Sequence, residues 1–175
     1  NDGTVFWMVE DPKDTDNLIT ANTFSGFLTG IVLNRDASMP DNDLTATIEH
    51  NVFLSGDTGV LAIGAVDATV RENDLSGLAI GVDGSSATAT VNASANWWGT
   101  ELPAGVAARV AGNVDYTPWF DVGTDVDPAD GFQGDYSYLH VDDTPQVGST
   151  GRIQEAINLV SSGGTVHVND GTYPE

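Results

Sequence analysis

Short apolar stretches alternate with polar turns through the first two thirds of the chain, and one pattern of positions recurs. An aliphatic residue stands three positions before an asparagine, and a large apolar residue stands two positions after it. Three clear copies centre on Asn22, Asn51 and Asn73, and a degenerate fourth copy ends in the Asn-Trp-Trp-Gly sequence that begins at Asn96. A glycine and a second apolar segment follow each clear copy. Short segments bounded by Gly, Asn and Asp predict β-strands.

The spacing of these copies predicts a solenoid. The four asparagines are separated by 29, 22 and 23 residues, and the longer first interval contains a polar, proline-containing loop at 34–43. A period of this size suits a coil of about three short strands per turn. Leucine-rich repeats share the period, but their leucine pattern is absent. Equivalent residues of successive turns should stack at about 4.8 Å, so we expect an all-β fold built from parallel turns.

The recurring asparagines are predicted to form a structural ladder. Asn22, Asn51, Asn73 and Asn96 would occupy the same bend of successive turns. Their amide groups can bond backbone atoms that would otherwise be buried without partners. Asparagine also tolerates the left-handed backbone conformation that such bends need. We therefore interpret these residues as structural and not catalytic.

Two positions beside the ladder bring charged residues together. Glu49 and Arg71 both stand two positions before a ladder asparagine, so they should lie on adjacent turns and form a surface ion pair. His50 and Glu72 share the position immediately before the asparagine. The flanking turns have alanine at that position, so a pair of catalytic carboxylates is not indicated.

The last third of the chain has a different pattern. Aspartate, glycine and proline are frequent in 121–148, which predicts a connecting segment. Apolar residues at positions 153, 156, 157 and 160 have helical spacing, with Thr150 as a candidate cap and two glycines as the stop. A strand is predicted at 165–168. The expected organisation is solenoid turns with their closure at 1–120, an acidic linker at 121–148 and a helix-strand unit at 149–175.

Several of these motifs resemble those of right-handed parallel β-helix proteins of the pectate-lyase-like superfamily. The resemblance covers 17–112, where Asn-x-Phe turns lead to Asn-Trp-Trp-Gly at 96–99, and it extends to Gly-Thr-Tyr at 171–173. It implies an all-β, right-handed parallel β-helix with one short capping α-helix near the C-terminus. In that superfamily an amphipathic helix covers the end of a β-helix and a Gly-Thr-Tyr segment enters its first coil. The unit at 149–175 would then open a next β-helix or cap a neighbouring subunit.

Composition narrows the range of partners. Five Lys and Arg against 26 Asp and Glu give a net charge of −21 over 175 residues, which disfavours nucleic acid and anionic membranes. No apolar run approaches the roughly 18 residues that a membrane span needs. The absence of cysteine excludes disulfides and thiolate zinc sites. The three histidines show no ligand spacing, so the sequence gives no support for zinc.

One acidic segment is a candidate calcium (Ca²⁺) loop. Asp125, Asp127 and Asp130 stand close together, followed by a turn-forming Gly131, and oxygen ligands of this kind suit a hard cation. The spacing is not that of an EF-hand, because the third acid comes one residue late and Pro128 interrupts the loop. This segment is therefore either a calcium site or a solvated linker that binds no metal.

The ends of the solenoid suggest a function. An open parallel coil exposes unpaired backbone groups and apolar side chains, which favours association. The unit at 149–175 can fold back over the first turn of its own chain, cap the next subunit, or belong to a longer tandem chain. We expect a structural protein of the extracellular space or cell surface, not an enzyme, that assembles with itself head to tail into a fibre or tandem array. The predicted interface residues are Val5, Trp7, Ile19, Ile153, Ile157, Val166, Val168 and Tyr173.

The alternative is a carbohydrate-binding or carbohydrate-active β-helix, similar to polysaccharide lyases. Lyases of that kind require bound calcium and a basic residue, for which Arg35, Arg71 and Arg109 are candidates. Aromatic residues gathered between 97 and 138 can bind sugar rings, but closure of a solenoid end would use the same residues. The charge of −21 argues against a polyanionic substrate unless cations intervene.

Overall fold

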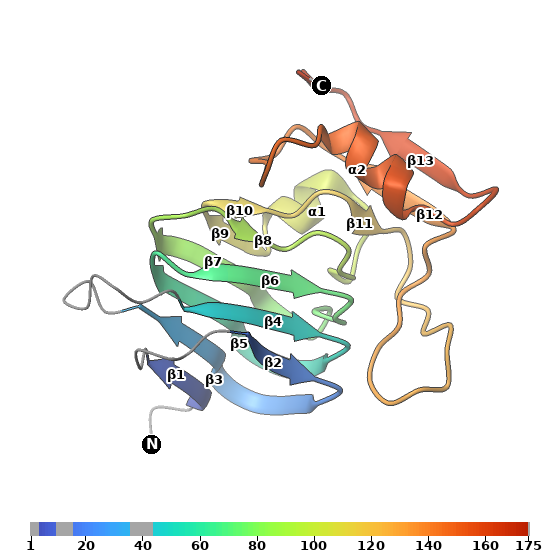
Figure 1. The fold of residues 1–175 in the computed structure, drawn as a ribbon. Helices are drawn as coiled ribbons and strands as arrows, with labels where there is room; N and C mark the ends of the chain where they lie inside the picture. Colours follow the sequence, from blue (N-terminus) through green and yellow to red (C-terminus); the bar gives the residue numbers. More distant parts are fainter. Residues whose placement is uncertain (1–3, 10–15, 36–43, 175) are drawn as a thin grey trace.

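A computed structural model describes residues 16–35 and 44–174, together with the backbone of 4–9. Its described residues form a parallel β-solenoid of about five turns, followed by a smaller C-terminal unit at 121–174 (Figure 1). The predicted all-β solenoid fold is therefore confirmed. Most of the predicted loop at 34–43 lies outside the described residues. No helix in the described part of the chain has the length and apolar character needed to span a membrane.

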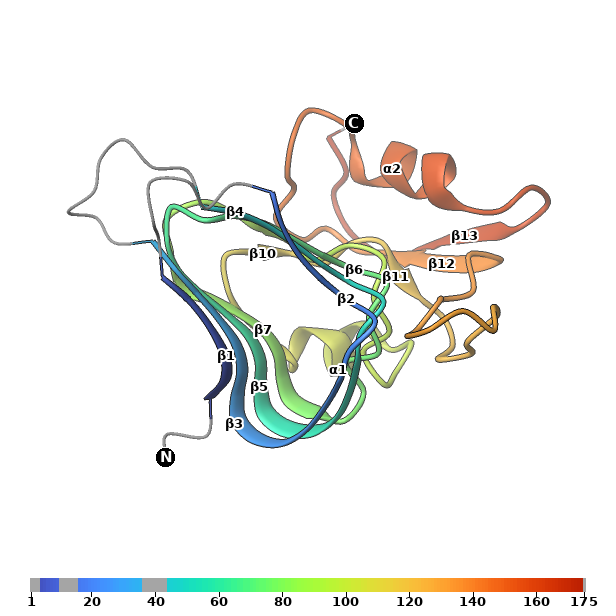
Figure 2. The same cartoon turned by 60° about the horizontal axis from the view of Figure 1, so that its bottom comes forward.

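Two five-stranded parallel sheets form the walls of the solenoid (Figure 2). Sheet A consists, in spatial order, of β1 (Thr4–Val9), β3 (Thr23–Asn34), β5 (Val52–Gly64), β7 (Leu78–Ala87) and β9 (Val110–Gly112). Sheet B consists of β2 (Asn17–Thr20), β4 (Thr45–Glu49), β6 (Asp67–Arg71), β8 (Val91–Asn92) and β10 (Val114–Asp115). Sequence order alternates between the sheets, so each turn contributes one strand to each.

The core lies between the two sheets, where equivalent residues of successive turns stack. Ile19, Ile48 and Val70 are paired in register across three strands of sheet B and are 6%, 0% and 0% exposed. Phe24 and Phe53 stack in the same way, with ring centroids 4.7 Å apart. Burial of each such side chain stabilises the fold by about 1.5–3 kcal/mol.

The bend that joins sheet B to sheet A differs from the prediction in one respect. The left-handed residues are the four that precede the ladder asparagines: φ is 56° at Ala21 and His50, 51° at Glu72 and 55° at Ala95. No asparagine in the described chain has a positive φ. The expectation of left-handed asparagines is therefore wrong. The asparagine side chains instead donate and accept the hydrogen bonds that hold their strained neighbours in place.

A short helix and a third sheet close the C-terminal end. Helix α1 (Pro103–Ala107) begins with a proline, which suits the first helical turn, and buries Val106 in the solenoid core. The sequence did not predict α1, because five residues are too few to show helical spacing. Sheet C contains β11 (Trp119–Phe120), β12 (Tyr138–Val141) and β13 (Thr165–Val168), with β12 antiparallel to β11 and parallel to β13.

The C-terminal unit departs from the sequence prediction in detail. Helix α2 (Arg152–Leu159) lies where a helix was predicted, but its N-cap is Gly151 and no side chain caps it, so Thr150 does not have that role. Strand β13 lies at the predicted position. Strand β12, in contrast, falls inside the segment predicted as a linker, and it is ordered because it pairs with a strand on each side.

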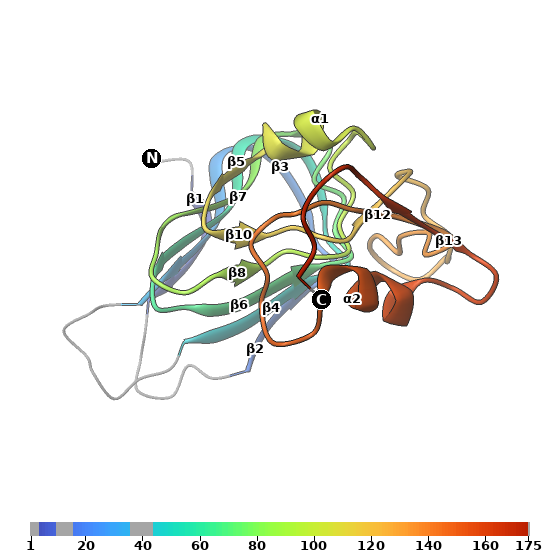
Figure 3. The ribbon, with the colours of Figure 1, turned by 90° about the horizontal axis from the view of Figure 1, so that it is seen from above.

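The C-terminal unit packs on the C-terminal end of its own solenoid (Figures 1 and 3). Strand β11 follows the last turn and pairs with β12, so that Trp119 lies opposite His140. The first turn lies at the other end of the solenoid. A fold-back of this unit over the first turn, one of the three arrangements left open by the sequence, is therefore not the one adopted.

Candidate functional site

The asparagine ladder is a continuous chain of buried hydrogen bonds. The backbone N–H and the side-chain Nδ2 of Asn51 both donate to Oδ1 of Asn73, each at 3.0 Å. Asn73 donates to Oδ1 of Asn96 in the same two ways, also at 3.0 Å. These three side chains are fully buried, whereas Asn22 at the first turn is exposed. The geometry is that of a structural element, because every amide is occupied by backbone or by the next asparagine.

Charged residues line the edge of the solenoid beside the ladder. Arg71 donates to Glu49 through Nη2 at 2.7 Å and Nε at 3.0 Å, on adjacent turns as the repeat predicts. At the position immediately before the ladder asparagine, His50 Nδ1 lies 3.5 Å from Glu72 Oε2 on the adjacent turn. Burial and the nearby carboxylate of Glu72 raise the pKa of Tyr136, which stays a neutral phenol. The charged side chains along this edge therefore pair with one another.

The segment 121–137 packs against this edge. The backbone N–H of Phe132 donates to the carbonyl oxygen of His50 at 3.1 Å, and Nδ1 of His50 lies 3.0 Å from the carbonyl oxygen of Phe132. Gly131 has a φ of +90°, and a Cβ there would come within 1.9 Å of the His50 oxygen. Only glycine permits this close approach, so the contact depends on that residue.

The predicted calcium residues lie in the exposed part of the same segment. Asp125, Asp127 and Asp130 are all exposed. The carboxylate of Asp127 accepts from the N–H of Ala129 at 2.9 Å, as expected of a turn-forming aspartate. Among the described residues, no three His, Asp or Glu side chains are placed to hold a metal ion together. Calcium binding at this segment stays a prediction.

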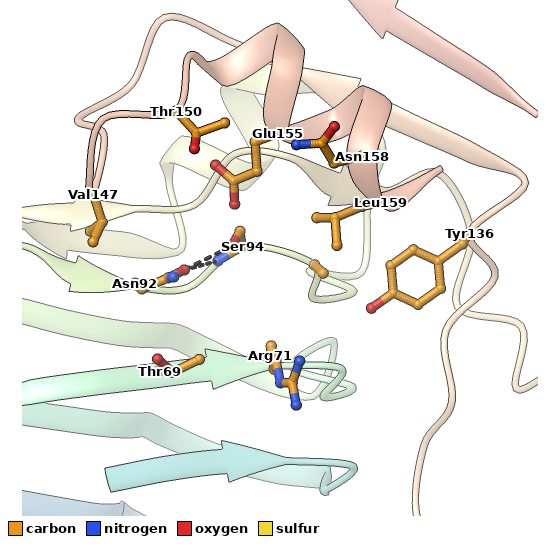
Figure 4. Close-up of a pocket in the computed structure, with 11 residues that line it drawn as sticks. Thr69, Arg71, Asn92, Ser94, Tyr136, Val147, Thr150, Glu155, Asn158 and Leu159 are labelled. Atoms are coloured by element: carbon orange, nitrogen blue, oxygen red, sulfur yellow. Dashed lines mark hydrogen bonds between the residues drawn. The ribbon is translucent and has the colours of Figure 1, made fainter. Parts of the chain in front are cut away.

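A cleft of about 340 Å³ lies between the outer face of sheet B and the C-terminal unit (Figure 4). One wall is formed by outward-facing residues of sheet B, and the opposite wall is formed by α2 and the segments that precede it. Most of the lining side chains can form hydrogen bonds. The lining residues are Thr69, Arg71, Asn92, Ser94, Ala95, Tyr136, Val147, Thr150, Glu155, Asn158 and Leu159.

The cleft has one cation and one anion on opposite walls. Arg71 projects from β6, and Glu155 projects from α2 towards sheet B (Figure 4). Glu155 accepts from Gln146 Nε2 at 2.7 Å, and Ser94 Oγ donates to Asn92 Oδ1 at 2.7 Å. The sequence did not predict this cleft, because its two walls come from parts of the chain that lie more than 40 positions apart. The alternation of polar residues on the outer face of sheet B was the only available signal.

The arginines proposed for lyase chemistry have structural partners. Arg71 is paired with Glu49. Nη1 of Arg109 donates to the carbonyl oxygens of Ser76 and Leu78 at 2.9 and 2.8 Å. Nη1 of Arg35 lies 3.5 Å from a backbone carbonyl oxygen. The structure does not bring these three arginines together at one site.

A buried carboxylate joins the last solenoid turn to the C-terminal unit. Asp115 is 1% exposed, and its Oδ2 accepts from the N–H of Val147 at 2.7 Å. Burial, and to a lesser extent the negative charge of Glu155, raise its pKa to about 7 against the lowering effect of the backbone N–H groups and Arg152. This carboxyl group therefore titrates near neutral pH.

Two of the three histidines lie side by side in sheet C. His140 and His167 are paired in register on β12 and β13, with ring centroids 5.2 Å apart. The buried His140 stacks on Trp119, and its Nε2 lies 2.7 Å from Oδ1 of Asp121. Distance along the sequence had suggested three unrelated histidines, but the parallel pairing of β12 and β13 brings two of them together.

The residues predicted to form an assembly interface lie at both ends of the structure. Val5 and Trp7 belong to β1, of which only the backbone is described, and Ile19 is 6% exposed because it faces the core of its own solenoid. On the C-terminal unit, Ile157 is 52% and Val168 39% exposed. Three further predicted residues are partly buried there: Ile153, Val166 and Tyr173.

Comparison with known proteins does not identify a relative. No protein-family model, no curated protein and no solved structure matches the chain.

Proposed function

We propose that this protein is a structural module of the extracellular space or cell surface, which assembles with further copies head to tail through its solenoid ends. The observation that carries the proposal is that both ends of the described structure finish in parallel strands with a free outer edge. These strands are β1 and β2 at one end and β13 at the other. We further propose that the chain is a pectate-lyase-like β-helix whose role is structural and not enzymatic.

The C-terminal edge is suited to accept another strand. The N–H groups of Thr165 and Asn169 donate to the carbonyl oxygens of Ser137, which precedes β12, and of Val141, at its end. Because alternate residues of a strand bond to opposite sides, the N–H and C=O groups of Val166 and Val168 point towards the outer edge. No described strand pairs with that edge. Unpaired edges of this kind are templates for another chain.

The N-terminal end also offers strands with an edge that no described strand pairs with. Strands β1 and β2 end sheets A and B, and every strand of these sheets is paired in parallel. A second copy placed on β13 would add a further strand to sheet C. A head-to-tail contact uses different surfaces on the two copies, and when the copies stack along the solenoid axis it repeats without closing and gives a fibre or array.

A charge placed at the edge tests the proposal. The variant Val168→Lys introduces a charge at the free edge of sheet C, and Leu54→Lys makes the same change at a 60% exposed residue in the middle of sheet A. Light scattering should show that Val168→Lys prevents concentration-dependent assembly, whereas Leu54→Lys assembles like the unmodified chain. Equal assembly of all three chains would contradict the proposal.

A second candidate, carbohydrate binding, is favoured by the cleft between sheet B and α2. Its hydroxyl and amide groups, together with the ring of Tyr136, are the side chains that bind sugars. A glycan array read with the unmodified chain and with Asn92→Ala tests this candidate. Binding that is lost in the variant supports it, and release of unsaturated sugars would indicate lyase activity. A blank array for the unmodified chain would contradict it.

The exposed acidic segment is the candidate binding site for calcium. We propose Asp125, Asp127 and Asp130 as its ligands, because aspartate oxygens suit a hard cation. Calorimetric titration of Ca²⁺ should then give a saturable heat that is lost in Asp127→Asn. The control is Asp57→Asn, the same charge change at an exposed residue of β5. A heat that is unchanged in Asp127→Asn would contradict this ligand set.

A further inference from the structure

The imidazoles of His140 and His167 form a pair that the fold brings into contact. They occupy the same face of sheet C, in register on neighbouring parallel strands. Their ring centroids are 5.2 Å apart, and the ring planes are tilted by 57°. His140 is 7% exposed and His167 is exposed at the outer strand, so the pair is reached from the solvent side of β13.

Asp121 selects the tautomer of the neutral His140 ring. A carboxylate only accepts, so the contact of 2.7 Å between Asp121 Oδ1 and His140 Nε2 places the proton of the neutral imidazole on Nε2. Nδ1 of His140 then has an unprotonated lone pair. This atom is buried and has no hydrogen-bond partner in the described part of the chain. A buried acceptor without a partner is costly, and a ligand at that position would remove the cost.

From these contacts we propose that His140 and His167 bind one divalent transition-metal ion, with zinc (Zn²⁺) as the first candidate. Two imidazoles bound to a tetrahedral ion through N–metal distances of about 2.0–2.1 Å have ring centroids roughly 5 Å apart, which agrees with the observed separation of 5.2 Å. The pairing of His140 with Asp121 is the carboxylate–histidine arrangement that orients a metal ligand. Asp121 is thus a positioning residue.

The chemistry of the pair selects the class of metal. Imidazole nitrogen prefers zinc, copper or nickel, whereas calcium prefers oxygen ligands. With only two protein ligands, water molecules complete the coordination, and the affinity is lower than at a closed structural site. This site is separate from the acidic segment around Asp127, which would take a hard cation.

Calorimetric titration of Zn²⁺ into the full chain, in a large excess of Ca²⁺ to occupy exposed carboxylates, tests the site. The unmodified chain should bind one ion, and His167→Ala should weaken binding at least tenfold. His50→Ala removes a histidine whose contacts are with Phe132 and Glu72, and this variant should bind like the unmodified chain. His167 is exposed, so its substitution leaves the core intact.

Two further measurements separate a ligand role from a structural one. Electron paramagnetic resonance of bound Cu²⁺ should show two coupled nitrogens in the unmodified chain and one in His167→Ala. Asp121→Asn should weaken Zn²⁺ binding about 10–100-fold through loss of ligand orientation. Absence of Zn²⁺ binding to the unmodified chain, or equal binding by His167→Ala, would overturn the proposal.

Discussion

The side-chain oxygen of Asn96 accepts two hydrogen bonds from Asn73, one from its backbone N–H and one from Nδ2, both at 3.0 Å. Nδ2 of Asn73 also donates to the carbonyl oxygens of Ile48 and Arg71, at 2.9 and 2.8 Å. One buried side chain thus joins three successive turns. Because neither residue is exposed to water, loss of the amide leaves several backbone groups without partners.

Removal of a ladder amide should therefore destabilise the whole solenoid. We expect Asn73→Ala to lower the free energy of unfolding by about 2–4 kcal/mol, since buried donors and an acceptor lose their partners. Asn22→Ala changes the same residue type at the exposed end of the ladder and should cost less than about 1 kcal/mol. Urea unfolding followed by circular dichroism measures both. Similar losses in the two variants would show that burial does not set the strength of the ladder.

The ion pair beside the ladder should contribute much less. The side chain of Arg71 is 50% exposed, and solvent screens its attraction to Glu49. We expect a coupling free energy of about 0.2–1 kcal/mol from a double-mutant cycle of Arg71→Ala and Glu49→Ala. High salt should reduce it further. A coupling above about 2 kcal/mol would mean that the pair is held more rigidly than its exposure indicates.

A single glycine should control the packing of 121–137 on the solenoid. Gly131→Ala places a Cβ against the carbonyl oxygen of His50, so the segment has to move away. Gly148→Ala is the matched control, since Gly148 also has a positive φ, of 77°, but no atom lies within 4 Å of the position of its Cβ. Hydrogen exchange at the amide of Phe132 should become much faster in Gly131→Ala only. Equal protection in both variants would show that the contact with His50 is not maintained in solution.

The buried Asp115 should make stability depend on pH. Its pKa rises from 3.8 in the unfolded chain to about 7 in the folded protein, so the folded state binds the proton more strongly. This contribution is fully present below about pH 4 and is lost as the pH rises through 7, by on the order of 4 kcal/mol for a shift of three units. Asp115→Asn should remove most of this dependence.

The pH measurement needs a control for the high net charge. Asp57→Asn makes the same charge change at an exposed residue and should leave the slope of stability against pH nearly as it is in the unmodified chain. Chemical unfolding at a series of pH values from 4 to 9 compares the three chains. If Asp115→Asn and Asp57→Asn had the same slope, the burial of Asp115 would not be the origin of the effect.

The parts of the fold that repeat could be predicted from the sequence, and the parts that depend on unique contacts could not. The pairing of Glu49 with Arg71 follows from their identical positions relative to the ladder. The left-handed residue at each bend was assigned to asparagine, because residue preferences do not say which of two neighbours takes the strain. The pairing of His140 with His167 and the cleft beside Glu155 depend on how the C-terminal unit packs, which no local pattern encodes.

Sedimentation velocity over a range of protein concentrations, with electron microscopy of the same samples, tests the central proposal most directly. End-to-end assembly predicts a sedimentation coefficient that rises continuously with concentration, and thin unbranched filaments at the highest concentrations. Discrete closed oligomers would contradict the proposal, because copies that stack along the solenoid axis do not close into a ring. A monomer at every concentration would contradict the proposal that the free edges of β1 and β2 at one end and of β13 at the other join successive copies.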